Sequence, residues 1–416
     1  MRKTFLIFGV LGLMMIWSTS GWAQDLKELE RRIDIMSDEL DALKESGGGG
    51  LAERVHVHGY GELHFNLPTD GSGDGQFDNH RFVLGVNAKL SDWIHLNVEI
   101  DFEHGAQEME FEFGYLDFLL SPKLNARAGV VLVPMGFLNE YHEPPLFWTV
   151  ERPTFHSRII PTTWNASGAG IFGSPMDGVN YRLYLVNALQ SIRPNPPGSP
   201  ACKAGSGTGL GGNCSRFNAK EGIRKGRLQP NKGIFEDFAI AGRVELTKLL
   251  PGLQTGFSFH AGNTTQNLIP EGGYTVMLEA DVKYRFRWFD MNASIAHINI
   301  SDAAAINAFQ IANGDAGDVA SGIFGWNVQA GVHLPQLMGW STSHDLIPHL
   351  MYEFIDTQNE MPAGTAPDRS RELRILTTGV SYMPIPEVAL KFDYQHTSKS
   401  NGDRVDQVNI GVAYMY

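Results

Sequence analysis

The chain of 416 residues carries a formal net charge of −13, and 43% of its residues are hydrophobic. This acidic balance argues against a nucleic acid as the partner. The mean hydropathy of −0.17 resembles that of a soluble protein, so the order of residues along the chain has to distinguish a soluble enzyme from a membrane protein.

Residues 1–23 predict a secretory signal peptide. Arg2 and Lys3 precede an apolar run over 5–17, and small residues lead up to the expected cleavage site after Ala23. A membrane anchor is the weaker interpretation, because the run is shorter than the roughly 20 apolar residues that a membrane helix needs. We therefore expect the mature protein to leave the cytoplasm.

Residues 24–46 predict a coiled-coil helix. Apolar residues recur there at alternating spacings of three and four, which is the stripe through which helices pair: Leu26, Leu29, Ile33, Met36, Leu40 and Leu43. A single amphipathic helix packed on its own domain is the alternative, but the glycine-rich linker 47–54 separates the helix from the rest of the chain. A detached helix this short is marginal in water, so it needs partner helices.

From residue 55 onward, apolar and polar residues alternate. In "WIHLNVEIDFE", for example, Ile94, Leu96 and Val98 share one face of a strand, whereas Asn97 and Glu99 share the other. Each such segment is about 10 residues long, which is what a strand needs to cross a bilayer at a barrel's tilt. This pattern continues to the end of the chain.

We count about sixteen strands, and the expected fold class is all-β: a sixteen-stranded antiparallel transmembrane β-barrel over 55–416, preceded by the short coiled-coil helix. The strands lie near 55–67, 80–90, 93–103, 110–120, 124–134, 166–173, 177–187, 236–247, 253–262, 274–287, 289–300, 325–334, 346–356, 372–383, 387–397 and 406–416. No connector after an odd-numbered strand is expected to be a tight turn, whereas most connectors after even-numbered strands are, which matches the short turns and longer loops of outer-membrane barrels. A soluble β-sandwich also alternates, but it seldom needs such uniform strands.

The last strand, "DQVNIGVAYMY", ends the chain on an aromatic residue. A closed barrel has no free edge, so the last strand must pair with the first. We expect Tyr414 and Tyr416 to point outward, where aromatic rings favour the headgroup boundary.

The stretches "VHGYGELHFN", "HRFVLGVNAKLSDWIHLNVEIDFEHG" and "ARAGVVLVPMGFLNEYHEPPLFWTVERPTFHSRIIPTTWNASGAGIFG" resemble a family of Gram-negative porins grouped with the phosphate-selective O/P type. The resemblance is strongest over 55–190 and implies a sixteen-stranded trimeric channel. Arginine ladders and lysine clusters accompany the phosphate preference in that group. The present chain is acidic and has no ladder that can be matched residue by residue.

The long connector 135–165 is expected to fold into the barrel and narrow it, as the resemblance suggests. Its prolines would stiffen it. The charges that it offers to a constriction are Glu140, Glu143, Glu151, Arg152 and Arg158. The alternative is a packed lid whose charges pair with each other.

The inward faces of the strands carry charges of both signs. Acidic residues gather on the third and fourth strands, and basic residues lie on the others. Opposed charges of this kind would create an electric field across the interior. The alternative is that the charged side chains only keep the pore filled with water. The expected lining residues are Glu99, Asp101, Glu103, Arg182, Arg243, Lys283, Arg285, Arg287 and Lys391.

We expect no metal, no cofactor and no enzymatic activity. His56, His58, Glu62 and His64 share one face of the first strand, but residues in line span too far for one tetrahedral site. No serine or histidine motif of a hydrolase is present.

The connector 188–235 holds both cysteines and a basic cluster. Cys202 and Cys214 are expected to form a disulfide outside the cytoplasm, two free thiols being the alternative. The basic residues would either bridge lipopolysaccharide phosphates or a neighbouring subunit, which we favour, or fold over the mouth and draw anions to it.

These patterns together predict an outer-membrane porin, a water-filled channel for passive diffusion of small hydrophilic solutes or ions. The expected partners are two further copies in a homotrimer, membrane lipid and lipopolysaccharide, with the helix in the periplasm. The alternative is a structural anchor whose coiled coil tethers the cell wall or a partner.

Overall fold

A computed structural model describes residues 54–71, 73–193, 215–228 and 235–416. The expected signal peptide, coiled-coil helix, disulfide and nearly all of the linker lie outside these residues. Contacts divide the chain into Met1–His56 and Val57–Tyr416, and the second unit holds the fold.

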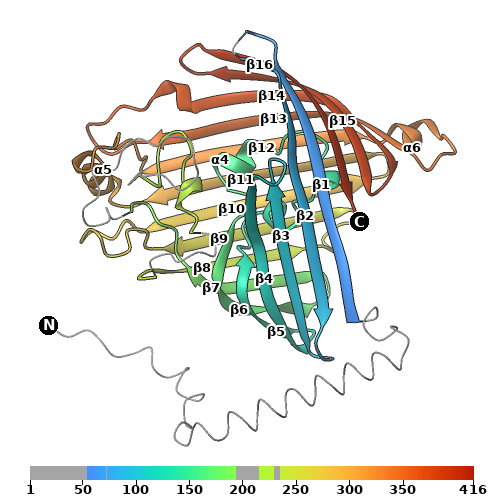
Figure 1. Cartoon of the computed structure of the whole chain (residues 1–416), viewed down its shortest axis with the longest axis horizontal. Coiled ribbons are helices and arrows are strands. Elements are labelled where there is room, and N and C mark those ends of the chain that lie inside the picture. Colours follow the sequence, from blue (N-terminus) through green and yellow to red (C-terminus); the bar gives the residue numbers. More distant parts are fainter. Residues whose placement is uncertain (1–53, 72, 194–214, 229–234) are drawn as a thin grey trace, which may run out of the picture. The chain divides into compact units, whose positions relative to one another are not determined.

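In the described part of the chain, sixteen antiparallel strands form one closed barrel, each paired with its neighbours in chain order (Figure 1). The last strand pairs with the first, and Tyr60 lies opposite Met415. The predicted barrel and its strand number are confirmed. The strands are β1 (Val55–Pro68), β2 (Gln76–Lys89), β3 (Ile94–Glu103), β4 (Glu108–Ser121), β5 (Leu124–Leu132), β6 (Asn165–Met176), β7 (Val179–Asn187), β8 (Phe238–Leu246), β9 (Leu253–Gly262), β10 (Thr275–Phe286), β11 (Phe289–Ile300), β12 (Gly322–Val332), β13 (Asp345–Glu360), β14 (Glu372–Ile385), β15 (Val388–Lys399) and β16 (Arg404–Met415).

Short helices occupy the connectors. They are α3 (Phe137–Glu140), η1 (Pro144–Leu146), α4 (Phe155–Arg158), η2 (Arg224–Gly226), α5 (Ala303–Ala312), α6 (Leu334–Met338) and η3 (Arg369–Arg371). Within the described ranges, no helix has both the length and the apolar composition that a membrane crossing would require.

The connectors depart from the prediction in two places. Most odd-numbered strands are followed by long connectors, but β3 and β4 are joined by the short turn 104–107, and β15 and β16 by 400–403. His104, Gly105 and Ala106 adopt left-handed backbone conformations, with φ of 51°, 67° and 67°. Three such residues in a row reverse the chain at once, which the alternation of polar and apolar residues could not indicate.

The outward face of the barrel is apolar. Exposed side chains of this face include Leu84, Leu183, Ile240, Val244, Phe257, Leu278, Ile295, Leu350, Leu390, Phe392, Ile410 and Val412. Tyr416 stacks on Phe82 at the end where the chain terminates. Its hydroxyl donates to the Val83 carbonyl at 3.3 Å, and its ring fills the space that a side chain at Gly59 would need. The outward orientation expected of the terminal tyrosine is confirmed.

A bulge in β4 changes which residues point inward. Glu99 pairs with Phe113 and Ile100 with Phe111, so Glu112 is an extra residue on β4. Beyond the bulge, Tyr115 and Asp117 share the inward face. The bulge explains why Asp117 breaks the alternation in the sequence.

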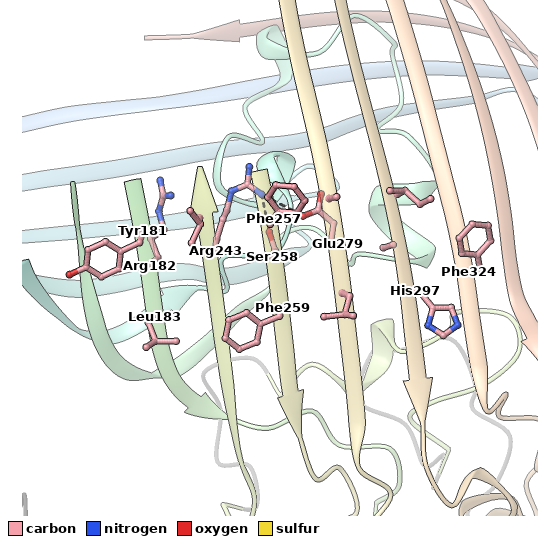
Figure 2. A pocket seen from close by; sticks show the side chains of 15 residues that line it. Tyr181, Arg182, Leu183, Arg243, Phe257, Ser258, Phe259, Glu279, His297 and Phe324 are labelled. Atoms are coloured by element: carbon pink, nitrogen blue, oxygen red, sulfur yellow. Dashed lines mark hydrogen bonds and ion pairs between the residues drawn. The ribbon is translucent and has the colours of Figure 1, made fainter. Parts of the chain in front are cut away.

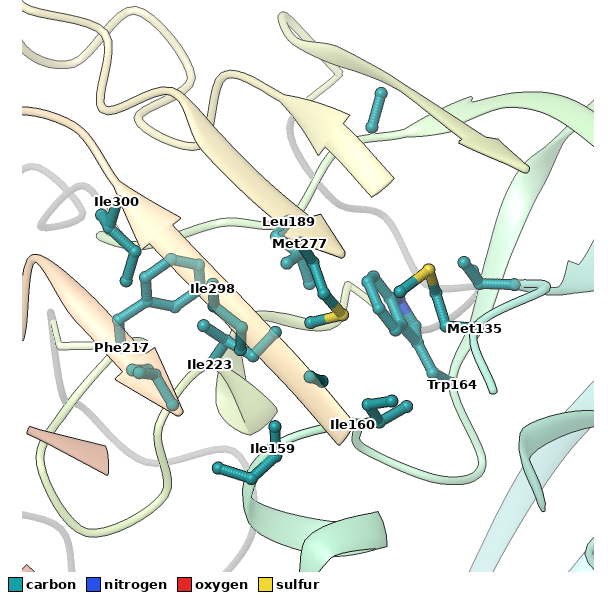
Figure 3. Close-up of a cluster of buried hydrophobic side chains, with 14 of the residues drawn as sticks. Met135, Ile159, Ile160, Trp164, Leu189, Phe217, Ile223, Met277, Ile298 and Ile300 are labelled. Atoms are coloured by element: carbon teal, nitrogen blue, oxygen red, sulfur yellow. The ribbon is translucent and has the colours of Figure 1, made fainter. Parts of the chain in front are cut away.

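Part of the barrel interior is a hydrophobic core rather than a polar lining, which corrects the expected polar lumen. Met135, Ile159, Ile160 and Trp164 come from the connector between β5 and β6, and Leu189, Phe217 and Ile223 from the connector between β7 and β8. They pack against Met277, Ile298 and Ile300 of the wall (Figure 3). These buried apolar side chains hold both connectors against β7–β14.

Candidate functional site: the barrel interior and its crossing segment

Residues 133–164, referred to here as the crossing segment, enter the barrel between β5 and β6. Gly136 donates its backbone N–H to Ser258 Oγ of β9 at 3.1 Å. Val150 donates to Asp393 Oδ2 of β15 at 2.6 Å. The crossing segment starts at β5 and ends at β6, yet it contacts β9 and β15, which are not neighbours of these strands. This is expected for a loop that folds into the barrel.

Glu353 of β13 binds the start of α4. Its two carboxylate oxygens accept the backbone N–H groups of Thr154 and Phe155 at 3.0 and 2.8 Å. A carboxylate at this position satisfies donors that have no partner within the helix and also interacts favourably with the helix dipole. Lys391 of β15 instead donates to the carbonyls of Pro144 and Thr149 at 2.7 and 3.0 Å. Lys391 is thus a buried anchor of the crossing segment and not a free cation of the interior.

The charges of the crossing segment pair with other elements. Glu140 lies 2.8 Å from Arg182 of β7, and Glu151 lies 3.0 Å from His64 of β1. Arg158 pairs with Glu221 at 2.9 Å. The alternative of a lid with charges paired among themselves is therefore wrong for these three residues.

The pKa values of two carboxyls of the crossing segment, Glu143 and Glu151, shift in opposite directions. Burial raises the pKa of Glu143, against a smaller opposing effect of Arg152. Burial also acts to raise the pKa of Glu151, but the hydrogen bonds from His64 and Asn66 and the charges of His64 and His80 together outweigh it and hold that pKa below its usual value. Glu151 therefore keeps its charge at lower pH than Glu143.

Carboxylates of β1–β4 form what we call the acidic wall: Glu62, Glu99, Asp101, Glu103, Glu110 and Glu112. Arg81 lies among them, with contacts of 2.9 Å to Glu62, 3.3 Å to Asp101 and 3.0 Å to Glu103. Six carboxyl groups thus lie around a single guanidinium of the strands. The sequence prediction placed Glu99, Asp101 and Glu103 on this face, and the structure brings them together.

Arginines of the two inserted connectors interact electrostatically with the acidic wall; we refer to Arg152, Arg224 and Arg227 as the arginine face. Arg227 donates to the carbonyls of Thr162 and Thr163 at 3.1 and 3.0 Å. Burial and the neighbouring Arg224 lower the pKa of Arg227 to about 10, whereas Glu110 and Glu112 act to raise it. Arg227 therefore stays protonated at neutral pH.

The placement of Arg224 and Arg227 corrects our preference for a basic loop held outward at lipopolysaccharide. These residues are half-buried against the crossing segment, and Lys225 between them is exposed. The opposed charges expected across the interior are present, but the cations come from connectors rather than from strands.

A second ionic cluster surrounds Arg243 of β8, which is 1% exposed. It forms two hydrogen bonds with Asp281, at 2.5 and 3.0 Å. Contacts of 2.9 Å with Glu245 and 3.5 Å with Glu279 complete its surroundings. Arg182 lies 3.0 Å from the same Glu245. Both arginines therefore form ion pairs with neighbouring carboxylates, and they do not line up as an arginine ladder along the interior.

The three remaining predicted lining residues occupy different positions. Lys283 points inward, with its Nζ 4.0 Å from the centre of the Phe137 ring. Arg285 lies 2.9 Å from Asp290 and has a 64% exposed side chain. Arg287 lies beyond the end of β10, in the turn to β11, with φ of 53° and its guanidinium over Phe286. Arg287 is therefore not a lining residue, since the strand ends one residue before it.

Hollows occur on both faces of the barrel. Outside, an apolar groove of about 680 Å³ runs over β7–β12 between Leu183, Phe259 and Phe324 (Figure 2), whereas Arg243 and Glu279 of the same strands turn to the interior. Inside, a cavity of about 370 Å³ is lined by Arg127, Glu140 and Arg182, and another of about 640 Å³ lies nearer the tight turns.

The first strand carries His64, one of the residues that the sequence analysis considered as a possible metal ligand. His64 lies 3.0 Å from Glu62 and from Glu151. In the described ranges, a different trio, Asp78, His80 and His104, offers three ligand-type atoms within 4.8 Å of one another. Asp78 accepts hydrogen bonds from both of these imidazoles at 3.0 and 2.9 Å.

Sequence reasoning did not select Glu353, Asp281 or Asp393, although they hold the crossing segment and Arg243. Each lies on the inward parity of its strand, so the alternation could have indicated the side chain's direction. Its partner could not have been found, because Val150 and Asp393 are 243 positions apart.

No family model matches the chain. A protein of Aquifex aeolicus (strain VF5) described as uncharacterized is 28% identical over 374 residues, covering 87% of this chain and 80% of its own. Among solved structures, OmpF of Salmonella typhi in complex with daunomycin aligns with a TM-score of 0.54 at 11% identity, covering 87% of this chain and 97% of that one. The anion-selective porin of Comamonas acidovorans aligns with a TM-score of 0.52 at 12% identity, covering 87% and 99%. The outer-membrane channel DcaP of Acinetobacter baumannii aligns with a TM-score of 0.53 at 10% identity, covering 87% and 97%. At these identities the likeness concerns the fold alone.

Proposed function

We propose that the chain forms an outer-membrane channel for passive diffusion of small hydrophilic solutes or ions. The observation that carries this proposal is the charged interior: an acidic wall faces an arginine face inside a closed barrel whose outer surface is apolar. A barrel without free edges and with such an outer surface suits lipid. Opposed charges in a confined space orient and select small charged or dipolar solutes. The solved channels with a similar barrel support this assignment, and no enzymatic activity is proposed.

We expect the channel to be weakly cation-selective or nearly neutral, because the acidic wall exceeds its own Arg81. Changing Glu103 to Gln should shift the reversal potential toward anions, and changing Arg227 to Gln should shift it toward cations. Each change should alter the permeability ratio of K⁺ to Cl⁻ by roughly two-fold. The measurement is conductance and reversal potential of the purified protein in a planar bilayer under a KCl gradient.

Lys225→Gln is the matched control, since this exposed neighbour of Arg227 should have the smallest effect. Equal shifts for Lys225 and Arg227 would show that surface charge alone sets the preference. A folded barrel without conductance would instead favour the structural anchor. The test is needed because the hydrophobic core fills part of the barrel interior. We do not extend the phosphate preference of the O/P-type porins to this chain.

We also propose a homotrimer with the helix 24–46 as a parallel coiled coil in the periplasm. One solved neighbour, OmpT of Vibrio cholerae, is described as a trimer form and aligns with a TM-score of 0.50 at 9% identity. Three helices tethered to one assembly have a high effective concentration, which offsets the weakness of a short coil. A cysteine introduced at Ile33 should crosslink into higher species in intact outer membranes. Monomers only would contradict the proposed coil.

A further inference from the structure

The cavity of about 640 Å³ lies at the end of the interior that holds the tight turns; we call it the inner vestibule. Its lining includes Gly252 of the β8–β9 turn, His333 after β12 and Pro386 of the β14–β15 turn. The size is in the range that small-molecule sites occupy, roughly 300–1,000 Å³. The inner vestibule is therefore large enough to hold a solute and not only water.

One wall of the inner vestibule is an apolar surface of the crossing segment. It is formed by Phe137, Pro145, Leu146 and Trp148. The Leu146 side chain is 51% exposed, so it faces the vestibule rather than the core of the barrel. An exposed apolar surface beside a few charged groups in a cavity is typical of a binding site.

Lys283 and Arg285 also line the vestibule, and they point the same way because they are two residues apart on β10. Two carboxylates line it as well: Asp290 pairs with Arg285 at 2.9 Å, and Asp345 pairs with His333 at 2.5 Å. In the described part of the chain, Lys283 has no carboxylate within salt-bridge distance, and its Nζ lies over the rings of Phe137 and Tyr141 at 4.0 and 5.5 Å. Arg243 by contrast contacts several carboxylates. Among the described residues, Lys283 thus has cation–π contacts and no salt bridge.

We propose that the inner vestibule binds a small organic carboxylate with an aromatic body, of the benzoate type. The carboxylate would sit between Lys283 Nζ and the part of the Arg285 guanidinium that its pairing with Asp290 leaves exposed, and the ring would lie on Leu146 and Trp148. A small inorganic anion would leave the apolar surface unused, and a cationic aromatic would be repelled by Lys283. This inference deepens the proposed channel function and rests on it for the access of solutes to the interior.

The experiment is equilibrium binding of benzoate to the full chain, purified and folded in detergent, measured by calorimetry. Acetate tests the need for the ring, and benzylamine tests the need for the negative charge. Lys283→Met should weaken benzoate binding by roughly ten-fold or more, because a charge-assisted hydrogen bond is lost. Lys248→Met is the matched control, since Lys248 is an exposed lysine at the same end that pairs with Asp177.

Two further variants keep the test decisive if Lys283→Met fails to fold. Lys283→Arg should retain benzoate binding, and Leu146→Ser should weaken it while leaving both cations in place. Equal binding of acetate and benzoate, or unchanged binding in Leu146→Ser and Lys283→Met, would overturn the proposal. Because binding is measured without conductance, a barrel that binds benzoate but does not conduct would refute only the channel, and one that conducts without binding would refute only the site.

Discussion

Replacing Arg243 with Met should destabilise the folded barrel by about 3–5 kcal/mol. The guanidinium is 1% exposed, and its removal leaves Asp281, Glu245 and Glu279 close together without their shared cation. Uncompensated buried charge is far costlier than the loss of an exposed ion pair, because water cannot replace the missing partner. The measurement is the unfolding midpoint in urea for the detergent-purified barrel.

Lys248→Met provides the comparison for this substitution. Lys248 and Asp177 also form an ion pair, at 2.6 Å, but their side chains are 63% and 80% exposed. Its loss should change stability by less than about 1 kcal/mol. If the two variants unfolded at the same urea concentration, the cluster around Arg243 would not be a structural element of the barrel.

The double change of Glu353 and Asp393 to Ala should release the crossing segment and increase single-channel conductance. Three backbone N–H groups, those of Val150, Thr154 and Phe155, would lose their acceptors. Each lost anchor should cost about 1–3 kcal/mol, because the buried donor is left without a partner. We expect larger and noisier current steps, and faster proteolysis between residues 139 and 158.

Asp368→Ala is the matched control for the release of the crossing segment. Asp368 also accepts a backbone N–H, that of Ser370 at 2.9 Å, but it caps η3 in an outer connector. This variant should keep the conductance and protease resistance of the unmodified chain. Unchanged current steps in the double variant would mean that the crossing segment does not limit passage.

The two outcomes separate what each charged group does. Arg243 forms its ion pairs with strand residues only in the described part of the chain, so its loss acts first on the barrel. Glu353 and Asp393 join the wall to the crossing segment, so their loss acts on the width of the interior. If the crossing segment narrows the channel, the Arg243 variant should lower the stability of the barrel, and the Glu353 and Asp393 variant should raise its conductance.

The barrel and the direction of most side chains could be predicted from the order of residues alone. The alternation of apolar and polar residues is a local property of each strand. It is pronounced in this chain because one face of each strand is apolar and the other carries charges, so the bounds of all sixteen strands could be predicted to within a few residues. The same alternation placed Glu99, Asp101 and Glu103 on the inward face. It failed at Asp117 and at Arg287, where a bulge and an early strand end interrupt the period of two.

The roles of the inward residues emerged only from the folded chain. The sequence places Lys391 among the lining cations, yet it holds the carbonyls of Pro144 and Thr149, about 240 positions away. The sequence places Arg227 in an outer basic loop, yet it lies against Thr162 and Thr163. The role of an interior charge depends on which distant segment fills the space beside it. That packing is set by strand register, by connector path and by the hydrophobic core around Met277, none of which leaves a periodic mark in the sequence.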